Sequence, residues 1–437
     1  MSEAGMGGPN HPVVVAPLAS RFFSLPAGAS LEEPDGVSPG ATHPAGFVAA
    51  GVVAGLKDSG RPDMGVLAVG PEWHAKAASA GVFTRNSFAA APVIVNRTEC
   101  DLEHILAVAM NSGNANACTG EPGLVVARAM QTACAEELGI PARQVAVGST
   151  GIIGVQLDPV FMAKGVKMAA AAVKPGGGPS FNHSIMTTDR YPKICAVTVD
   201  TSAGQVRLGV CGKGAGMISP AMATMLCVVT TDAVLSPGQM QSLLKTAVDA
   251  SFNRITVDGE MSTNDTVLFL ASGASGVQPA GADLELLTAA LTAMLTRIAL
   301  MITADGEGAT KVMRLRVAGA ESEPGAVRVA RAIANSALVK TAMAGGDPNW
   351  GRIISSAGAA MAGTPLPEAT LKLGDVVVVE KGAMRPVTEE EREAMTAAVR
   401  RPEVDIRLDL GVGQASTEIF FADMGHEYIT INAEYHT

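Results

Sequence analysis

The sequence has few aromatic residues, no paired cysteines and no excess of basic side chains. Phe, Trp and Tyr make up 4% of its 437 residues, so aromatic platforms for stacking are not expected. Lys and Arg number 32 against 42 Asp and Glu, a net charge of −10, which argues against nucleic acid as a general partner. The six cysteines occur singly and no histidine pair has metal-ligand spacing, so we expect no disulfide framework and no metal site.

Long apolar runs are also missing. No stretch of about 18 apolar residues is free of charge or of a Thr or Gly interruption, so no membrane span is expected. The first 45 residues are broken by Pro, Gly and Ser and carry Glu3, Glu32, Glu33 and Asp35, which disfavours a secretory or transit leader. We expect residues 1–45 to be a flexible extension and the protein to be cytoplasmic. An organelle matrix is the alternative if the extension is the remnant of a processed leader.

Glycine (48 residues) and alanine are abundant, and 48% of the chain is apolar, enough for one large domain and a smaller one. Residues 46–52 alternate small with apolar side chains, and residues 89–95 repeat this theme, which predicts strands. Residues 124–138 and 283–301 have apolar positions at helical spacing, and Gly139 follows the first of them. This pattern predicts a mixed α and β fold without βαβ periodicity.

A central stretch, residues 213–226, joins a glycine-rich turn to a Ser-Pro break and then to a threonine that opens an apolar strand. Thr224 lacks a nearby histidine to activate its hydroxyl, since the nearest in sequence are His183 and His426. Cleavage before Thr224 would free its α-amino group, whose pKa near ~8 suits a general base. The plain alternative is a loop that leads into a core strand.

Three further segments present polar groups at turns. Residues 148–154 put Thr150 beside Gly151, which can offer a hydroxyl and a backbone N–H to one oxyanion, although such turns are common. Residues 111–120 are rich in Asn and Gly and present amide dipoles, or simply turn the chain. Residues 305–311 set two acidic residues among glycines, as a solvated turn or as a carboxylate for a cationic amine.

These strings, taken in order, resemble the ornithine acetyltransferase family, also called bifunctional glutamate N-acetyltransferase, of arginine biosynthesis. The resemblance covers residues 46–437. Glu260 and Met261 depart from the family's Asp and Thr, and residues 420–425 depart from its usual string near the C-terminus. The matching strings are residues 80–86, 111–120, 148–154, 186–189, 213–224, 230–233, 255–267 and 345–352.

The resemblance implies a role for each matching site residue. Thr224 would be the nucleophile, freed by cleavage after Ala223, and Thr150 with Gly151 would stabilise the oxyanion. The substrate contacts it implies are Thr187, Lys213, Thr224, Glu307, Asn432 and Thr437. Charge gives a reason for two of them, since Glu307 suits a substrate α-ammonium and Lys213 an α-carboxylate. We expect an ordered strand over residues 428–437 that reaches back to the core.

The resemblance also implies a fold and a reaction. The fold is α+β, a layered sandwich of antiparallel sheets between helices, similar to N-terminal-nucleophile hydrolases, with a smaller subdomain over residues 313–437. Cleavage would give an α chain (46–223) and a β chain (224–437), and two copies of each would associate. Acetyl would pass from N2-acetyl-L-ornithine to L-glutamate through an acetyl-threonine enzyme, without a cofactor; acetyl-CoA stays open as a second donor. The alternatives are a self-processing aminopeptidase or amidase and a non-catalytic metabolite-binding relative.

Overall fold

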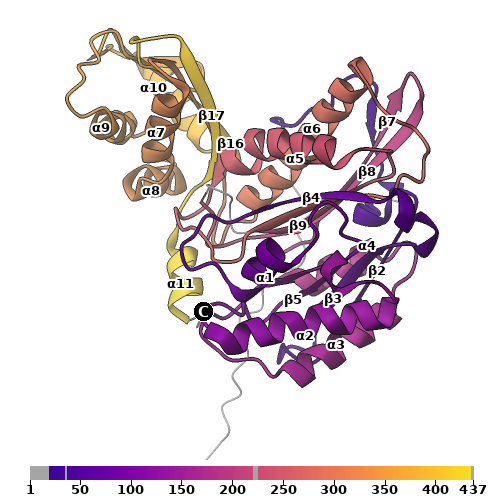
Figure 1. Cartoon of the computed structure of the whole chain (residues 1–437). Coiled ribbons are helices and arrows are strands. Elements are labelled where there is room, and N and C mark those ends of the chain that lie inside the picture. The colour runs from indigo at the N-terminus through magenta and orange to yellow at the C-terminus, as the bar shows by residue number, and fades with distance from the viewer. Residues whose placement is uncertain (1–18, 35–36, 220–224, 435–437) are drawn as a thin grey trace, which may run out of the picture.

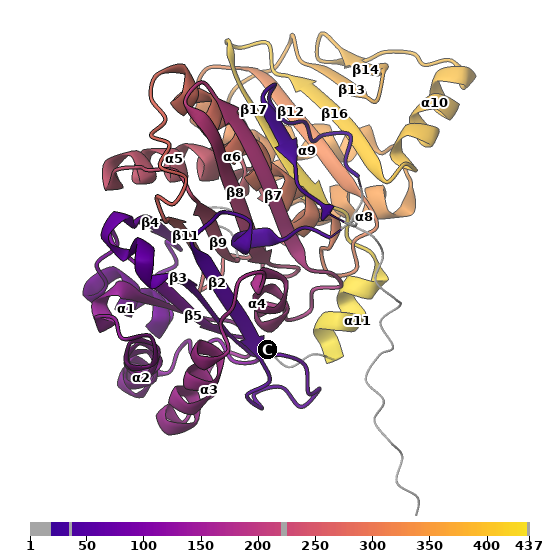
Figure 2. The same ribbon diagram turned by 90° about the vertical axis from the view of Figure 1, so that its right-hand side faces the viewer.

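The computed structural model describes residues 19–34, 37–219 and 225–434. Its main body has four layers, in which two sheets pack face to face and helices cover both outer faces (Figure 1). A smaller unit, formed by the C-terminal part of the chain, stands beside this body (Figure 2). The fold is therefore α+β, and the layered sandwich with a C-terminal subdomain is confirmed.

The first sheet has six strands in the order β1-β7-β8-β9-β11-β4. Neighbours are antiparallel except β9 and β11, which run parallel. Every residue of β9 and β11 is buried because both faces of the sheet are covered, so these strands are mostly apolar and do not alternate with polar residues along their length. The strands are β1 (Ala29–Leu31), β4 (Ala78–Phe83), β7 (Lys193–Thr201), β8 (Gly204–Lys213), β9 (Leu226–Thr231) and β11 (Thr266–Ala271).

The second sheet has four strands in the order β2-β3-β5-β6, and here β5 and β6 are the parallel pair. Because these two strands run in register, their last residues, Asn111 and Ser149, lie side by side. The strand predicted over residues 46–52 is confirmed as β2. The strands are β2 (Phe47–Val52), β3 (Met64–Val69), β5 (Ala107–Asn111) and β6 (Val145–Ser149).

Helices cover the outer faces of both sheets. α5 and α6 pack on the first sheet, and α1, α2 and α3 pack on the second. α5 begins with a capping box between Ser236 and Gln239, and α2 ends at Gly139 with φ of 66°, as glycine permits. The helices predicted over residues 124–138 and 283–301 are thus confirmed. The bounds are α1 (Ala91–Glu99), α2 (Gly120–Leu138), α3 (Pro159–Ala171), α4 (Gly178–Ile185), α5 (Pro237–Ala250) and α6 (Ala282–Ala304).

Helix α6 is long and apolar enough, by length and composition, to cross a membrane. Its most apolar window is 61% buried inside the protein, and Leu291, Leu295 and Ile298 are fully buried in the main core. Since α6 covers the first sheet, its apolar character is accounted for by packing within the fold.

The C-terminal unit is built on a third sheet, in the order β10-β17-β12-β16-β13-β14-β15, with its own core. Alternation along β17 sends Phe420 into the main core and Phe421 into this second core, which joins the two parts. The strands are β10 (Ile255–Thr256), β12 (Val312–Ala320), β13 (Thr370–Leu373), β14 (Val376–Glu380), β15 (Ala383–Met384), β16 (Glu403–Asp409) and β17 (Ala415–Ala422). The helices are α7 (Glu323–Ala334), α8 (Ala337–Gly345), α9 (Trp350–Ala360) and α10 (Glu389–Val399).

Two predicted strands are helices in the structure. Residues 89–95 lead into α1, because Pro92 sits in the first turn of a helix and Val93 and Val95 pack into the core from it. The C-terminal residues form α11 (His426–Glu434) instead of a strand, although Tyr428 to Ile431 favour β structure. A helix pairs its own backbone groups without a neighbouring strand, and α11 still reaches back to the body (Figure 1).

The described part of residues 1–45 packs against the body, which differs from the expected flexible extension. β1 pairs with β7, and the Phe22 ring lies 5.7 Å from that of Phe420. The Arg21 N–H donates to Glu403 Oε2 at 3.0 Å. Short 3-10 helices complete the fold at Gly40–Thr42, Pro71–Lys76, Ala142–Gln144 and Phe252–Arg254.

Candidate active site

Thr150 and Gly151 follow directly after β6 and pack on the loop of residues 111–117. The Thr150 N–H donates to Asn111 O at 3.0 Å, which fixes this turn against the end of β5. Gly151 has φ of +131°, and a Cβ there would lie 2.3 Å from the carbonyl carbon of Gly113. Only glycine allows so close an approach, so the Gly151 N–H is held at a defined place beside Thr150.

Both residues line a cavity of about 120 Å³ that collects four more of the predicted substrate contacts. The predicted residues that meet there are Thr150, Gly151, Thr187, Lys213, Glu307 and Asn432. Sequence reasoning did not assign a role to the rest of the lining, which is Ala115, Ile153, Thr188, Gly216, Met217, Ser262, Thr263 and Asn264. Residues far apart in the chain therefore form one polar site.

Lys213 ends β8 and is only 4% exposed. Its Nζ donates to Thr150 Oγ1 at 3.2 Å. Burial lowers the pKa of Lys213, and the negative charge of Asp189 opposes this lowering. We call Thr150, Gly151 and Lys213 the donor wall, because each contributes a hydrogen-bond donor to the cavity lining.

A second group is centred on Glu307, which follows α6. Glu307 Oε1 accepts from Thr188 Oγ1 at 2.8 Å, and Oε2 accepts from Asn432 Nδ2 at 2.9 Å. The Glu307 N–H donates to Ala215 O at 2.9 Å, which ties it to the turn after Lys213. We call Thr188, Glu307 and Asn432 the acceptor wall, because the carboxylate is its centre.

A buried carboxylate, Asp189, joins the Thr187 loop to the end of β8. Its Oδ2 accepts from the Thr187 N–H at 2.9 Å, and its Oδ1 accepts from the Gly214 N–H at 2.8 Å. Lys193 Nζ lies 2.6 Å from Asp189 Oδ1 and 2.5 Å from Asp305 Oδ2. Burial opposes ionisation of Asp189, yet the Lys193 ammonium keeps the pKa of this carboxyl below its usual value. The Met-Thr-Thr-Asp string includes Asp189, whereas no sequence signal marks Lys193.

The Asn-rich loop, residues 111–120, borders the cavity through Ala115 and is fixed by buried amides. Asn264 Nδ2 donates to Ala115 O at 2.6 Å and to Ser149 O at 2.8 Å. Ser149 Oγ donates to Asn111 Oδ1 at 2.6 Å. These bonds lock the ends of β5 and β6 to the polar loop before β11. Asn264 lies in a string that matches the family, but the sequence alone did not indicate that its amide would hold these two strand ends together.

Three residues of the predicted site, Ala223, Thr224 and Thr437, lie outside the described residues. The next described residue after the predicted cleavage point is Met225, whose N–H donates to Asp265 Oδ1 at 2.9 Å. Burial raises the pKa of Asp265 well above its usual value. The roles of Ala223, Thr224 and Thr437 stay predictions.

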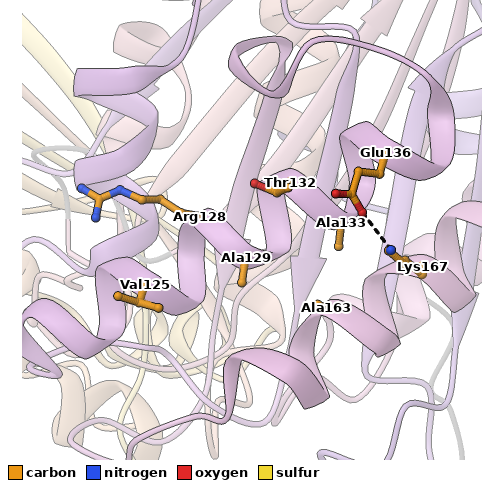
Figure 3. Close-up of a pocket in the computed structure, with 8 residues that line it drawn as sticks. All are labelled: Val125, Arg128, Ala129, Thr132, Ala133, Glu136, Ala163 and Lys167. Carbon is orange, nitrogen blue, oxygen red and sulfur yellow. Dashed lines mark ion pairs between the residues drawn. The ribbon is translucent and has the colours of Figure 1, made fainter.

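A larger hollow, of about 370 Å³, lies between α2 and α3 (Figure 3). Ala and Val side chains make up much of its lining, and Lys167 Nζ pairs with Glu136 Oε2 at 2.8 Å. It contains none of the residues predicted for the site. Across residues 19–34, 37–219 and 225–434, no group of His, Cys, Asp and Glu side chains could hold a metal ion.

The fold and the cavity define a layered α+β protein with a polar site where a hydroxyl, a lysine and a carboxylate converge. The chain belongs to the ArgJ family, whose model matches residues 48–437. This membership confirms the resemblance found in the sequence strings.

The chain is similar along most of its length to curated relatives named arginine biosynthesis bifunctional protein ArgJ. It is 42% identical over 403 residues to that of Symbiobacterium thermophilum, covering 91% of this chain and 98% of the relative. It is 42% identical over 393 residues to that of Nitratidesulfovibrio vulgaris, covering 90% and 98%. The relative from Bifidobacterium longum is 43% identical over 401 residues, covering 90% and 99%.

Solved structures of two proteins with related names, and of a more distant aminopeptidase, match parts of the chain. The arginine biosynthesis bifunctional protein argJ of Bacillus halodurans is 35% identical with a TM-score of 0.44, covering 47% of this chain and 97% of the other. The ornithine acetyltransferase of Mycobacterium tuberculosis, complexed with ornithine, is 37% identical with a TM-score of 0.39, covering 45% and 100%. An aminopeptidase of Ochrobactrum anthropi is 13% identical with a TM-score of 0.38, covering 62% and 86%.

Proposed function

We propose that this protein transfers the acetyl group of N2-acetyl-L-ornithine to L-glutamate in arginine biosynthesis, as a glutamate N-acetyltransferase. Its membership of the ArgJ family supports the pathway. The observation that carries the chemistry is the cavity itself, where the donor wall and the acceptor wall meet. Acetyl transfer develops negative charge on the acetyl oxygen, which hydrogen-bond donors stabilise. Its amino-acid substrates also carry an ammonium group, which a carboxylate can bind.

In the first half-reaction the Thr224 hydroxyl attacks the acetyl carbonyl carbon, and the Thr224 α-amine takes the hydroxyl proton. The oxyanion that forms accepts hydrogen bonds from the Thr150 hydroxyl and the Gly151 N–H. When the tetrahedral intermediate collapses, the C–N bond breaks and the leaving α-amine of ornithine receives the proton. The acetyl group is then an ester on Thr224.

In the second half-reaction the neutral α-amine of L-glutamate attacks the acetyl ester. The C–O bond to Thr224 breaks, and the hydroxyl regains a proton from the attacking amine through the Thr224 α-amine. The same donors serve both intermediates. The Glu307 carboxylate can pair with the ammonium group of either ornithine or glutamate. Thr187 lines the same cavity.

The nucleophile arises by self-cleavage between Ala223 and Thr224. The Thr224 hydroxyl attacks the Ala223 carbonyl, the peptide becomes an ester, and water hydrolyses that ester to leave Thr224 with a free α-amine. The products are an α chain ending at Ala223 and a β chain of residues 224–437. Two copies of each chain associate, in the cytoplasm. Acetyl-CoA is a second donor to be tested in the same assay.

The central experiment follows the acetyl group from N2-acetylornithine. With L-glutamate present, the purified protein should give N-acetylglutamate and ornithine in equal amounts, and little acetate. Formation of acetate alone would replace the transferase by a hydrolase with the same nucleophile, the aminopeptidase or amidase class. Cleaved protein that turns over neither donor would indicate a binding protein.

A second experiment tests the nucleophile. The purified protein should run as two chains, and Edman sequencing of the smaller should begin at Thr224. Thr224→Ala should remain one uncut chain, while Thr230→Ala, in the following strand β9, should still be cut. Recovery of a chain that begins at position 224 from Thr224→Ala would refute cleavage by this hydroxyl.

A further inference from the structure

A small apolar cluster at the cavity is separate from the larger cores of the protein. It consists of Ala90, Ala115 and Ala117, which are 1%, 3% and 0% exposed. The partly buried side chain of Ile153 packs against it. Ala115 and Ile153 also line the cavity, whose other lining side chains are mostly polar. This part of the cavity is suited to an apolar part of a substrate, because a polar group placed against it would lose hydrogen bonds to water.

The cluster lies directly beside the predicted oxyanion donors. The Ala115 N–H donates to Ile152 O at 2.9 Å, so Ala115 pairs with the residue that follows Gly151. Ile153 comes next in the chain and lines the same cavity. In an acetyl group the methyl carbon is bonded directly to the carbonyl carbon. A carbonyl oxygen held by Thr150 and Gly151 therefore brings the methyl group next to the apolar cluster.

The backbone of Ala115 is fixed through both of its polar groups. Its carbonyl oxygen accepts from Asn264 Nδ2 at 2.6 Å, and its N–H is the donor to Ile152. The cavity as a whole has a volume of only about 120 Å³. A wall whose backbone is held in this way limits the length of the group beside it, because extra carbon atoms can enter only by displacing packed ones.

Another apolar residue of the lining, Met217, belongs with the acceptor wall. Its N–H donates to Asp258 Oδ2 at 2.5 Å. It follows Gly216, where a Cβ would lie 2.5 Å from the carboxylate atoms of Glu307. Met217 is therefore placed beside the group that is proposed to bind the substrate ammonium. The apolar cluster and Met217 thus serve different parts of one substrate.

We propose that Ala115 and Ile153 form the acyl pocket of this protein and limit the transferred group to acetyl. This inference rests on the proposed acetyl transfer and adds to it the residues that select the acyl chain. The same acyl group is present in both half-reactions, so one pocket sets the selectivity for the donor and for the product. One methylene too many in a fitted apolar pocket lowers kcat/KM by roughly 10- to 200-fold.

The first test needs only the cleaved wild-type protein, L-glutamate as acceptor, and ornithine carrying a formyl, acetyl, propionyl or butyryl group on N2. Release of ornithine gives kcat/KM for each donor. Propionyl should be transferred roughly 10- to 200-fold less efficiently than acetyl, and butyryl less efficiently again. Equal efficiency for acetyl, propionyl and butyryl would overturn the pocket and leave the proposed function intact. Absence of acetyl transfer would overturn the proposed function itself.

Two substitutions should move this selectivity in opposite directions. Ile153→Ala shortens the wall and should raise the propionyl-to-acetyl ratio of kcat/KM by at least about 10-fold. Ala115→Val fills the pocket and should lower acetyl transfer by at least about 10-fold, while formyl transfer falls less than about 3-fold. Ile153→Val, a milder change, should shift the ratio in the same direction as Ile153→Ala. Ratios that stay at the wild-type value in all of these variants would overturn the proposal.

Met217→Ala is the matched control, because it also shortens an apolar side chain of the same cavity. It should change kcat/KM for the acetyl and propionyl donors by the same factor, so that their ratio stays within about 2-fold of wild type. A shift of this ratio in Met217→Ala as large as that in Ile153→Ala would mean that any loosening of the cavity admits longer chains. That result would refute the specific role of Ala115 and Ile153.

Discussion

The donor wall and the acceptor wall border the same cavity, yet they are built differently. Thr150 and Lys213 are 8% and 4% exposed and lie at the ends of strands in two packed sheets. Buried hydrogen bonds from the Asn264 amide and the Ser149 hydroxyl lock the backbone behind them. The backbone that carries these donors is therefore held by burial and by hydrogen bonds between strand ends.

The acceptor wall is attached more lightly. Glu307 lies on a loop, and Asn432 is an exposed residue of α11, a helix with no buried side chain. Helix α11 approaches the loop so closely that a Cβ on Gly308 would lie 2.4 Å from Tyr428 N. Because α11 buries no side chain, its attachment depends on a few contacts of this kind rather than on an apolar face.

The contrast fits two different tasks. Donors that stabilise a developing charge work best when they need no rearrangement at the moment of reaction. Groups that bind one amino acid, release it and accept another must allow exchange. Substitutions in the donor wall should therefore reduce kcat, and those in the acceptor wall should act mainly on substrate affinity.

The largest effect is expected at Thr150. Thr150→Val removes one oxyanion donor at nearly constant volume, so kcat for acetyl transfer should fall about 10²- to 10³-fold with KM little changed. Thr198→Val, at a buried threonine of β7 in the first sheet, is the matched control and should stay within about 2-fold. An equal loss in both variants, or a loss confined to KM, would remove Thr150 from the donor wall.

The second prediction concerns Lys340, a buried lysine that ties Val257 to Ala422 at the end of β17, the strand that precedes α11. This lysine of α8 is 1% exposed, and its Nζ donates to Val257 O at 2.7 Å and to Ala422 O at 2.6 Å. Burial lowers the pKa of Lys340 to about 8, from its ordinary 10.5. Between these values the unfolded chain binds more protons than the folded protein, so the free energy of unfolding rises with pH.

Relative to Lys340→Met, the wild type should therefore gain stability from pH 8 to about 10.5, by about 3 kcal/mol in total. Unfolding in urea at a series of pH values measures this difference. Lys174→Met, at an exposed lysine, should show no such trend relative to wild type. A wild-type advantage over Lys340→Met that is constant with pH would mean that Lys340 does not titrate in this range.

A third and smaller effect is expected at the centre of the acceptor wall. Glu307→Gln keeps the shape but removes the charge, which should lower kcat/KM for N2-acetylornithine about ten- to a hundred-fold, mostly through KM. Glu260→Gln, an exposed acidic residue of the loop before β11, should change it less than about 2-fold. A fall in kcat alone would place Glu307 with the donors and erase the distinction between the walls.

Much of the donor side could be predicted from sequence because its determinants are local. A strand followed by Ser-Thr-Gly, and a Lys before a glycine-rich turn, are visible in short strings, and the fold brings both to one cavity. The buried hydrogen bonds and ion pairs that hold these donors in place could not be predicted from the sequence. The pairing of Lys193 with Asp305 spans 112 positions, and only the packed sheets bring such residues together.

The acceptor side shows where sequence patterns mislead. Alternating β-branched and aromatic residues near the C-terminus predict a strand, but residues 426–434 form the helix α11 instead. The apolar run at residues 89–95 has the same ambiguity, and Pro92 in the first turn favours the helix α1. The prediction that the C-terminal segment reaches the site holds through Asn432, because that contact needs only proximity.

The smallest effect is expected at Asn432, the outermost member of the acceptor wall. Its Nδ2 donates to Glu307 Oε2 at 2.9 Å and to Tyr428 O at 2.9 Å, and the side chain is exposed. Asn432→Ala should raise KM for N2-acetylornithine about 2- to 10-fold, since a partly solvated bond contributes only about 0.5–1.5 kcal/mol. Thr430→Ala on the same helix controls for fraying of α11. If Asn432→Ala instead abolishes kcat, the C-terminal helix is as preorganised as the donor wall, and the light attachment inferred for α11 is wrong.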